Sequence, residues 1–250
     1  MVDQVENHKK EFGEAPVLSF EVPQPTVLIG QFSDLIESRS LLCLTDQGLS
    51  MSFSPRSDNV IRIVNTVRQD KKKFTYPNIK FRREDRWANA VKAVLYELAK
   101  ENIKIGGYNI LISGRGAGAD SWSLTSSLYF GTLYGISKLE NLNLSKGKIL
   151  EISKKANSFS PSNQARVRDL WILINAKPGK IYLWSEKKEE GEEIVYEGNG
   201  QKSFIVSSAL PFSVLTPEED EFRIEAKEVL ASMESKSVNL SDIRRLTEKE

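Results

Sequence analysis

The chain has 250 residues, 40% of them apolar and 28% charged, with a formal net charge of +1. This length and apolar content can build a sizeable core, and the near-neutral charge argues against a nucleic-acid partner. No stretch approaches the about 18 apolar residues of a membrane helix, so we expect a cytoplasmic protein with no membrane contact. Because the chain has one cysteine, Cys43, and one histidine, His8, we expect no disulfide framework, no His/Cys metal site and no Ser-His catalysis.

In chain order, the composition predicts three parts. Residues 1–15 are polar and charged, which is typical of a flexible leader. Residues 16–235 carry the apolar content and form the expected domain. Within it, residues 17–53 alternate apolar strands with turns, and the β-branched segment 59–67 predicts another strand. Residues 236–250 are expected to be a tail.

Three helices are predicted from apolar periodicity and capping signals. Residues 86–100 place apolar side chains on one helical stripe, which is typical of a core-facing helix. Ser145 is a candidate N-cap for a helix that runs through Asn157. Thr216 followed by Pro217 is a further helix start. The stripe expected to be buried in this last helix consists of Phe222, Ala226, Val229, Leu230 and Met233.

A glycine-rich loop between an apolar strand and a helix is typical of a phosphate-binding site, because glycines let backbone amides approach an anion. The loop carries Gly114, Gly116 and Gly118. A P-loop is excluded because no Lys-Ser/Thr pair follows the glycines. A dinucleotide-binding fingerprint remains an alternative, since Gly114, Gly116 and Ala119 satisfy G-x-G-x-x-A. Its acidic residue would be Glu140, which lies between two helical segments instead of at the end of a strand.

Four segments resemble galactokinases, which are members of the GHMP kinase superfamily. Residues 86–94, Arg-Trp-Ala-Asn-Ala-Val-Lys-Ala-Val, are similar to the family's W-A-N-Y-V-K-G-V helix. Residues 107–109 precede the glycine loop as a Gly-Phe-Asp strand precedes the family's P-x-G-x-G-L-S-S-S. Residues 156–169 run without gaps against A-E-H-x-x-x-G-x-x-C-G-x-M-D. Residues 23–35 resemble the signature P-G-R-V-N-L-I-G-E-H-T-D-Y.

This resemblance covers nearly the whole chain and implies its fold. We expect an α+β, GHMP-kinase N-terminal domain, similar to domain 2 of ribosomal protein S5, in which helices pack on a mixed sheet. The second GHMP domain is absent from this chain, and the tail at 236–250 resembles the segment that introduces it.

The resemblance also implies site residues. Asp169 falls on the family's catalytic aspartate, and Asp34 and Asp169 fall on substrate-binding positions. The nucleotide-binding positions fall on Trp87, Gly114, Gly116, Gly118, Ser121 and Ser123. Trp87 is equally well interpreted as a core anchor, and Asp169 as an ordinary polar residue at a helix edge. Mg²⁺ and ATP are expected as cofactors only if kinase activity is retained.

Several family residues are replaced in this chain. The catalytic arginine falls on Pro25, the sugar-binding Glu-His pair on Gln31 and Phe32, the metal-ligand glutamate on Asn157, the Cys-Gly pair on Ala165 and Arg166, two loop serines on Asp120 and Trp122, and a sugar-side tyrosine on Glu219. Phosphoryl transfer depends on positioning and on stabilisation by metal and cations. These replacements therefore predict that most of that machinery is lost.

Three functional classes follow from these residues. The first is a galactokinase-like protein without kinase activity that binds a ligand or a partner. The second is a divergent ATP-dependent sugar kinase, and the third is an unrelated α/β domain. For the first class we expect weak sugar or nucleotide binding. We also expect self-association or a protein partner at a cleft face where Phe32 and Trp122 lie near the opposite charges of Arg166 and Glu219.

Overall fold

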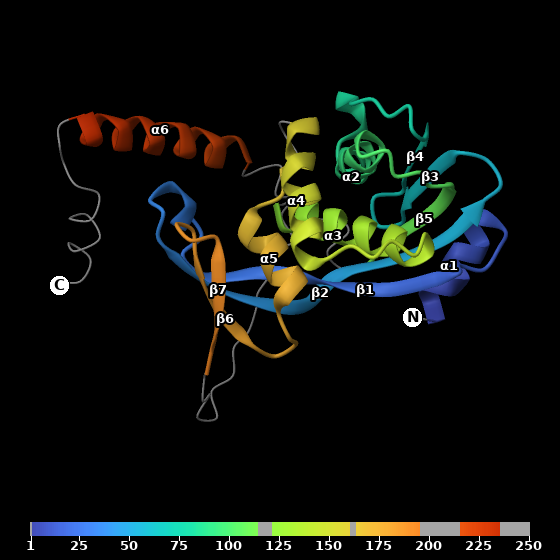
Figure 1. Cartoon of the computed structure of the whole chain (residues 1–250), viewed down its shortest axis with the longest axis horizontal. Coiled ribbons are helices and arrows are strands. Elements are labelled where there is room, and N and C mark those ends of the chain that lie inside the picture. The colour runs from blue at the N-terminus through green and yellow to red at the C-terminus, as the bar shows by residue number, and fades with distance from the viewer. Residues whose placement is uncertain (1, 115–121, 161–163, 196–215, 236–250) are drawn as a thin grey trace.

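The computed structural model describes residues 2–114, 122–160, 164–195 and 216–235. Its strands form a seven-stranded mixed sheet in the order β4-β3-β5-β2-β6-β7, with β1 paired to β2 (Figure 1). The strands are β1 (Leu18–Ile29), β2 (Arg39–Arg56), β3 (Val60–Asn65), β4 (Asp70–Thr75), β5 (Gly107–Ser113), β6 (Ile181–Ser185) and β7 (Glu190–Ile194). Among the described strands, β3 and β5 are the parallel pair, and the other pairs are antiparallel. The expected α+β fold with a mixed sheet is confirmed.

Strand β2 is the longest and joins the two arms of the sheet. It pairs with β1 along most of its length. Its second half, residues 50–56, pairs with β5, and its first half, residues 39–43, pairs with β6. The β6–β7 hairpin therefore extends the sheet at the opposite end from β4.

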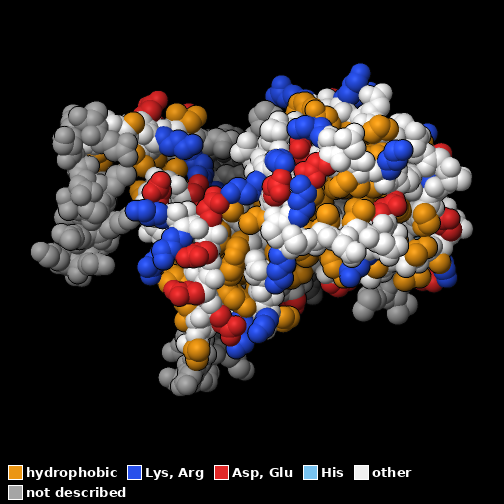
Figure 2. Space-filling view, viewed as in Figure 1, with side chains coloured by type: hydrophobic (Ala, Val, Ile, Leu, Met, Phe, Trp, Pro, Cys, Tyr) orange, Lys and Arg blue, Asp and Glu red, His pale blue; other side chains and the backbone are white. Residues whose placement is uncertain are grey.

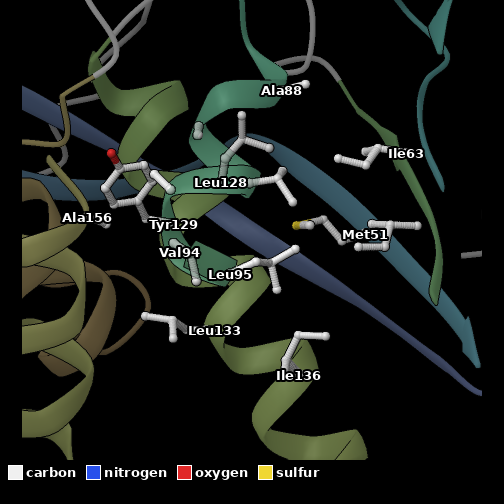
Figure 3. Close-up of a cluster of buried hydrophobic side chains, with 14 of the residues drawn as sticks. Met51, Ile63, Ala88, Val94, Leu95, Leu128, Tyr129, Leu133, Ile136 and Ala156 are labelled. Carbon is white, nitrogen blue, oxygen red and sulfur yellow. The ribbon is translucent and has the colours of Figure 1, made fainter. Parts of the chain in front are cut away.

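The helices are α1 (Val2–Phe12), α2 (Ala88–Lys100), α3 (Trp122–Leu139), α4 (Lys146–Ala156), α5 (Val167–Asn175) and α6 (Thr216–Ser235). Helices α2 to α5 pack on one face of the sheet, and α1 lies on the other face, against β2 and β5 (Figure 1). The main core lies between the sheet and helices α2 to α5, and several of its side chains are shown in Figure 3. No helix in the described ranges is long and apolar enough to cross a membrane.

Successive side chains of β2 point to opposite faces of the sheet, as in any strand. Met51 and Phe53 point into the main core. Helix α3 lies directly against them, since a Cβ on Gly131 would collide with the Met51 sulfur and one on Gly135 would lie 2.5 Å from the Phe53 ring. These glycines therefore allow α3 to approach the sheet closely.

The flexible leader expected over residues 1–15 is not observed, because residues 2–12 form helix α1 on the polar face of β2. Its His8 is fully buried, with Nδ1 2.8 Å from Ser52 Oγ and Nε2 3.0 Å from Ser54 Oγ. Gln4 Nε2 also donates to Ser52 Oγ, at 3.1 Å. The buried face of α1 is polar, so its sequence resembled that of an exposed segment.

The other helices agree in different degrees with expectation. Helices α2 and α4 are confirmed, and Ser145 Oγ caps α4 by accepting from the Lys148 N–H at 3.1 Å. Helix α6 begins at Thr216 as predicted, but the expectation of a buried stripe is wrong, because Phe222 is 48% and Val229 57% exposed. Periodicity identified an apolar face without identifying what covers it. The domain boundary at residue 235 and the tail remain predictions.

Candidate functional site

The glycine loop begins at the end of β5, where the backbone requires glycine. Gly114 has φ +96°, a conformation that residues with a Cβ rarely adopt. An added Cβ would also lie 2.7 Å from the Gly48 carbonyl oxygen and 3.0 Å from the Ser50 nitrogen. The start of the loop is thus packed closely against β2. Gly116, Gly118 and Ser121 lie outside the described residues.

Ser123, in the first turn of α3, connects the helix to β1. Its hydroxyl accepts a hydrogen bond from Gln24 Nε2 at 3.3 Å. The N-terminus of α3 therefore lies beside β1, where the positive end of a helix favours anions. The role of Ser123 in binding a nucleotide remains a prediction.

Trp87 lies at the same end of the sheet as the glycine loop. Its Nε1 donates to Asp70 Oδ2 at 2.9 Å. Asp70 pairs with Asn65 of β3, and Asn65 pairs with Ile112, two residues before Gly114. The indole is only 4% exposed and belongs to the main core. The core-anchor interpretation is thereby favoured, and contact with a nucleotide stays a prediction.

Arg168 organises the other part of the site, where α5 meets the end of β1. It is 2% exposed, and its guanidinium donates to the carbonyl oxygens of Gly30 and Gln31, each at 3.1 Å, and to Ser33 Oγ at 3.3 Å. Its Nε lies 3.5 Å from Asp169 Oδ1. Arg168 therefore joins the start of α5 to the loop after β1 and neutralises a buried carboxylate.

Asp169 is a buried acid in the first turn of α5. It is 4% exposed, and burial raises its pKa above the usual value, while the charges of Arg168 and Arg166 act in the opposite direction. A carboxyl group in this environment can take part in proton transfer or accept hydrogen bonds from ligand hydroxyl groups. The position is compatible with either predicted role of Asp169.

Asp34 lies in the 3₁₀ turn Ser33–Leu35 and is held by α6. Arg223 forms a two-pronged ion pair with it, at 2.7 Å and 3.2 Å. Burial alone would raise the pKa of Asp34, but the hydrogen bond from Arg223 and the charge of Arg166 hold it below its usual value. The Phe32 and Phe222 rings lie 5.0 Å apart and complete the contact of α6 with this turn.

Arg166 links the two predicted substrate carboxylates. Its guanidinium donates to the Gln31 carbonyl oxygen at 3.1 Å. Burial and the like charges of Arg168 and Arg223 lower its pKa to about 9, whereas Asp34 and Asp169 act to raise it. The structure therefore brings together the arginine–carboxylate cluster, which we define as Asp34, Arg166, Arg168, Asp169 and Arg223.

The sequence of the chain was compared with those of known proteins. No protein-family model matches the chain. A relative from Treponema pallidum, whose galactokinase assignment is itself provisional, is 24% identical over 204 residues, which are 82% of this chain and 51% of the relative. The galactokinase of Clostridium tetani is 28% identical over 181 residues, or 70% of this chain and 46% of that protein. The chain thus spans about half the length of these curated relatives.

Solved structures show the same relationship in the fold. Lactococcus lactis galactokinase, solved in complex with galactose, matches with a TM-score of 0.72 at 17% identity, covering 94% of this chain and 62% of the other. The chain is galactokinase-like in sequence and fold. Methanococcus jannaschii mevalonate kinase matches with a TM-score of 0.58 at 16% identity, over 86% of this chain and 71% of that one. The amino-terminal GHMP kinase fold expected from the resemblance is confirmed.

Asn157, which falls on the metal-ligand position of galactokinases, has a structural role here. Its Nδ2 donates to the Ala165 carbonyl oxygen at 2.9 Å, and its Oδ1 accepts from the Ala165 N–H at 2.8 Å. This pair of bonds fastens the end of α4 to the residue before Arg166. Both polar groups of the amide are therefore used by the backbone of the chain itself.

We expect Asn157→Ala to lower the free energy of unfolding by about 2 kcal/mol, because it leaves two backbone groups of the buried Ala165 without partners. Asn157→Asp should cost a similar amount, since it replaces the donor with a charge facing a carbonyl oxygen. Urea denaturation measures both. The neighbouring exposed Ser158→Ala is the control and should change the free energy by less than about 0.5 kcal/mol. Equal effects of all three changes would contradict the role of Asn157.

Sequence reasoning missed two cations of the cluster. Arg168 and Arg223 act on residues far away in the chain, so no local spacing indicated them. Within the described ranges, no group of three His, Cys, Asp or Glu residues could hold a metal ion. The side chains of Trp122 and Glu219 lie outside the described part, so the predicted pairing of Arg166 with Glu219 stays a prediction.

Proposed function

We propose that this chain binds a sugar at the arginine–carboxylate cluster and does not transfer phosphate to it. The galactokinase-like sequence and fold support a sugar as the class of ligand, and we extend to this chain the galactose seen in the Lactococcus lactis structure. Asp34 and Asp169, placed together by the fold, supply hydroxyl-accepting oxygens. A cytoplasmic location is part of this proposal.

The chemistry of the cluster suits a polyhydroxylated ligand. Carboxylates accept hydrogen bonds from hydroxyl groups, and guanidinium groups donate to ring and hydroxyl oxygens. Phe32 and Phe222, which are 39% and 48% exposed, add apolar surface beside Asp34. The Asp34 carboxylate already forms an ion pair with Arg223. A sugar would have to share or displace that ion pair, which supports weak binding.

The proposal that the chain does not transfer phosphate rests on the hydrogen bonds of Asn157. Phosphoryl transfer needs a divalent metal and cations that neutralise the developing charge. Asn157 is neutral, and both of its polar groups are already bonded to Ala165. Pro25, at the position of the catalytic arginine, is a strand residue opposite Leu44 and carries no charge. Two electrostatic elements are therefore missing together.

A divergent sugar kinase that uses Mg²⁺ and ATP is the second candidate, and Asp169 favours it. A buried carboxyl group with a raised pKa is a suitable proton acceptor for a sugar hydroxyl group. In that case the metal ligands would come from residues other than Asn157. The expected self-association or protein partner at the face around Phe32 also remains a proposal.

Calorimetry with galactose tests the binding proposal. We expect saturable heat with the unmodified chain and about a tenfold weaker affinity for Asp34→Asn and for Asp169→Asn, since each loses charge-assisted hydrogen bonds. Asp46→Asn removes an exposed carboxylate of β2 that is not part of the cluster and should leave the affinity unchanged. Absence of binding, or an equal effect of all three changes, would contradict a sugar site at the cluster.

A further inference from the structure

Positive charge is concentrated in one part of this almost neutral chain. Residues 60–92 contain ten of the 35 lysines and arginines but only three of the 34 acidic residues. The ten are Arg62, Arg68, Lys71, Lys72, Lys73, Lys80, Arg82, Arg83, Arg86 and Lys92. The fold collects this segment at one edge of the molecule, because β4 is the last strand of the sheet. In Figure 2, lysine and arginine side chains lie along the top of the molecule, above α2.

A pocket of about 280 Å³ opens at this edge. It is formed by β4, the loop that follows it and the first half of α2. Its lining residues are Lys73, Phe74, Thr75, Asn78, Lys80, Arg82, Asp85 and Lys92. Four of these are cations and one is an acid, so the pocket has an excess of positive charge.

The deepest of the four cations is Lys92. It is 3% exposed, its Nζ donates to the Asp85 carboxylate and to the Lys80 carbonyl oxygen, and it lies 5.2 Å from the centre of the Phe74 ring. These contacts hold a buried ammonium group at a defined position. The single acid of the pocket is thereby used to neutralise Lys92.

The remaining cations of the pocket have no acidic partner among the described residues. Within the described part of the chain, Lys73, Lys80 and Arg82 form no ion pair. Lys73 also stands directly opposite Arg62 in the antiparallel β3–β4 pair, where like charges destabilise a sheet. Of these two cations, Arg62 interacts electrostatically with the carboxylate of Asp58. An anion in the pocket would relieve the excess charge on the side of Lys73.

The outer edge of β4, at the end of the described sheet, supplies neutral donors as well. The Tyr76 N–H donates to the Asn59 carbonyl oxygen, which sets the alternation of the ladder. The N–H groups of Lys73 and Thr75 therefore point away from β3, toward the edge where the pocket lies. Backbone N–H groups, an amide from Asn78 and several cations are the groups that bind phosphate oxygens in proteins.

We propose that this pocket binds a small molecule through a phosphate or diphosphate group. The site is separate from the glycine loop, because Asp70 marks the loop end of β4 and Lys73 to Thr75 lie roughly 10–17 Å further along the strand, at about 3.4 Å per residue. It shares no residue with the arginine–carboxylate cluster. The inference is therefore independent of the proposed sugar binding.

Titration with inorganic phosphate and with pyrophosphate at constant ionic strength, followed by amide NMR shifts, tests this inference. We expect saturable shifts at Thr75, Asn78 and Arg82, and tighter binding of pyrophosphate. The double variant Lys80→Gln/Arg82→Gln should weaken binding about tenfold, because two charge-assisted contacts are lost. Both side chains are exposed, so the fold should tolerate the changes.

The matched control is Lys104→Gln/Lys187→Gln, which removes the same charge from exposed positions elsewhere and should leave binding unchanged. Further titrations with a sugar phosphate and with ADP show which of these two phosphate-bearing molecules the pocket binds more tightly. Three results would overturn the inference: no saturable shifts, shifts confined to the glycine-loop end around Gly114, or equal weakening by both double variants.

Discussion

Replacing Arg168 by methionine should lower the free energy of unfolding by about 3–5 kcal/mol, the range found when one partner of a buried ion pair is removed. The change leaves the Asp169 carboxylate buried without its closest cation. It also removes the donors to the carbonyl oxygens of Gly30 and Gln31. Chemical denaturation measures the effect.

Two variants separate this electrostatic role from simple loss of packing. Arg39→Met removes an exposed arginine and should change the free energy of unfolding by less than about 0.5 kcal/mol. Adding Asp169→Asn to Arg168→Met should recover about 1–2 kcal/mol, since the amide avoids a buried unpaired charge. If the double variant is as unstable as the sum of the single variants, Asp169 does not depend on Arg168.

Acid should destabilise the chain through His8 by up to about 3 kcal/mol. Burial lowers the pKa of His8 from 6.5 to about 4, and the opposing charge of Glu14 only partly compensates. The folded state therefore binds this proton less readily than the unfolded chain. The stabilisation is complete above pH 6.5 and is lost as the pH falls toward 4.

Denaturation curves at several pH values test this effect. Between pH 6.5 and 4.5 the free energy of unfolding should fall in the unmodified chain and stay nearly level in His8→Gln. Glu14, whose pKa is lowered by hydrogen bonds from Ser54 and Asn109, contributes only at more acidic pH, where carboxylates protonate. The same slope in both proteins would show that His8 is not the titrating group.

Much of the fold followed from local sequence signals, and its exceptions have physical causes. The stripe of α2 and the cap of α4 depend on residues three or four positions apart, which a sequence displays directly. Helix α1 was missed because Gln4 and His8 are buried against serines of β2, and a polar interface gives no apolar periodicity. Burial of α6 was wrongly expected because an apolar stripe does not reveal what covers it.

Residues of the candidate site were proposed from the sequence only where single positions matched known patterns. Asp34 and Asp169 were proposed in this way, and the structure brings them into one cluster, while their roles as ligand-binding residues stay predictions. Arg223, by contrast, reaches Asp34 across 189 positions of the chain. The structural use of Asn157 was equally hidden, because a sequence shows that a carboxylate is replaced but not what the amide binds.

A ³¹P NMR time course with galactose and Mg·ATP tests the central proposal most directly. We expect that no sugar phosphate signal appears and that ATP is hydrolysed no faster than without the protein, while calorimetry detects galactose binding. The contradicting result is a galactose phosphate signal that requires Mg²⁺, grows in proportion to the amount of protein and disappears in Asp169→Asn. That result would establish the chain as a divergent sugar kinase.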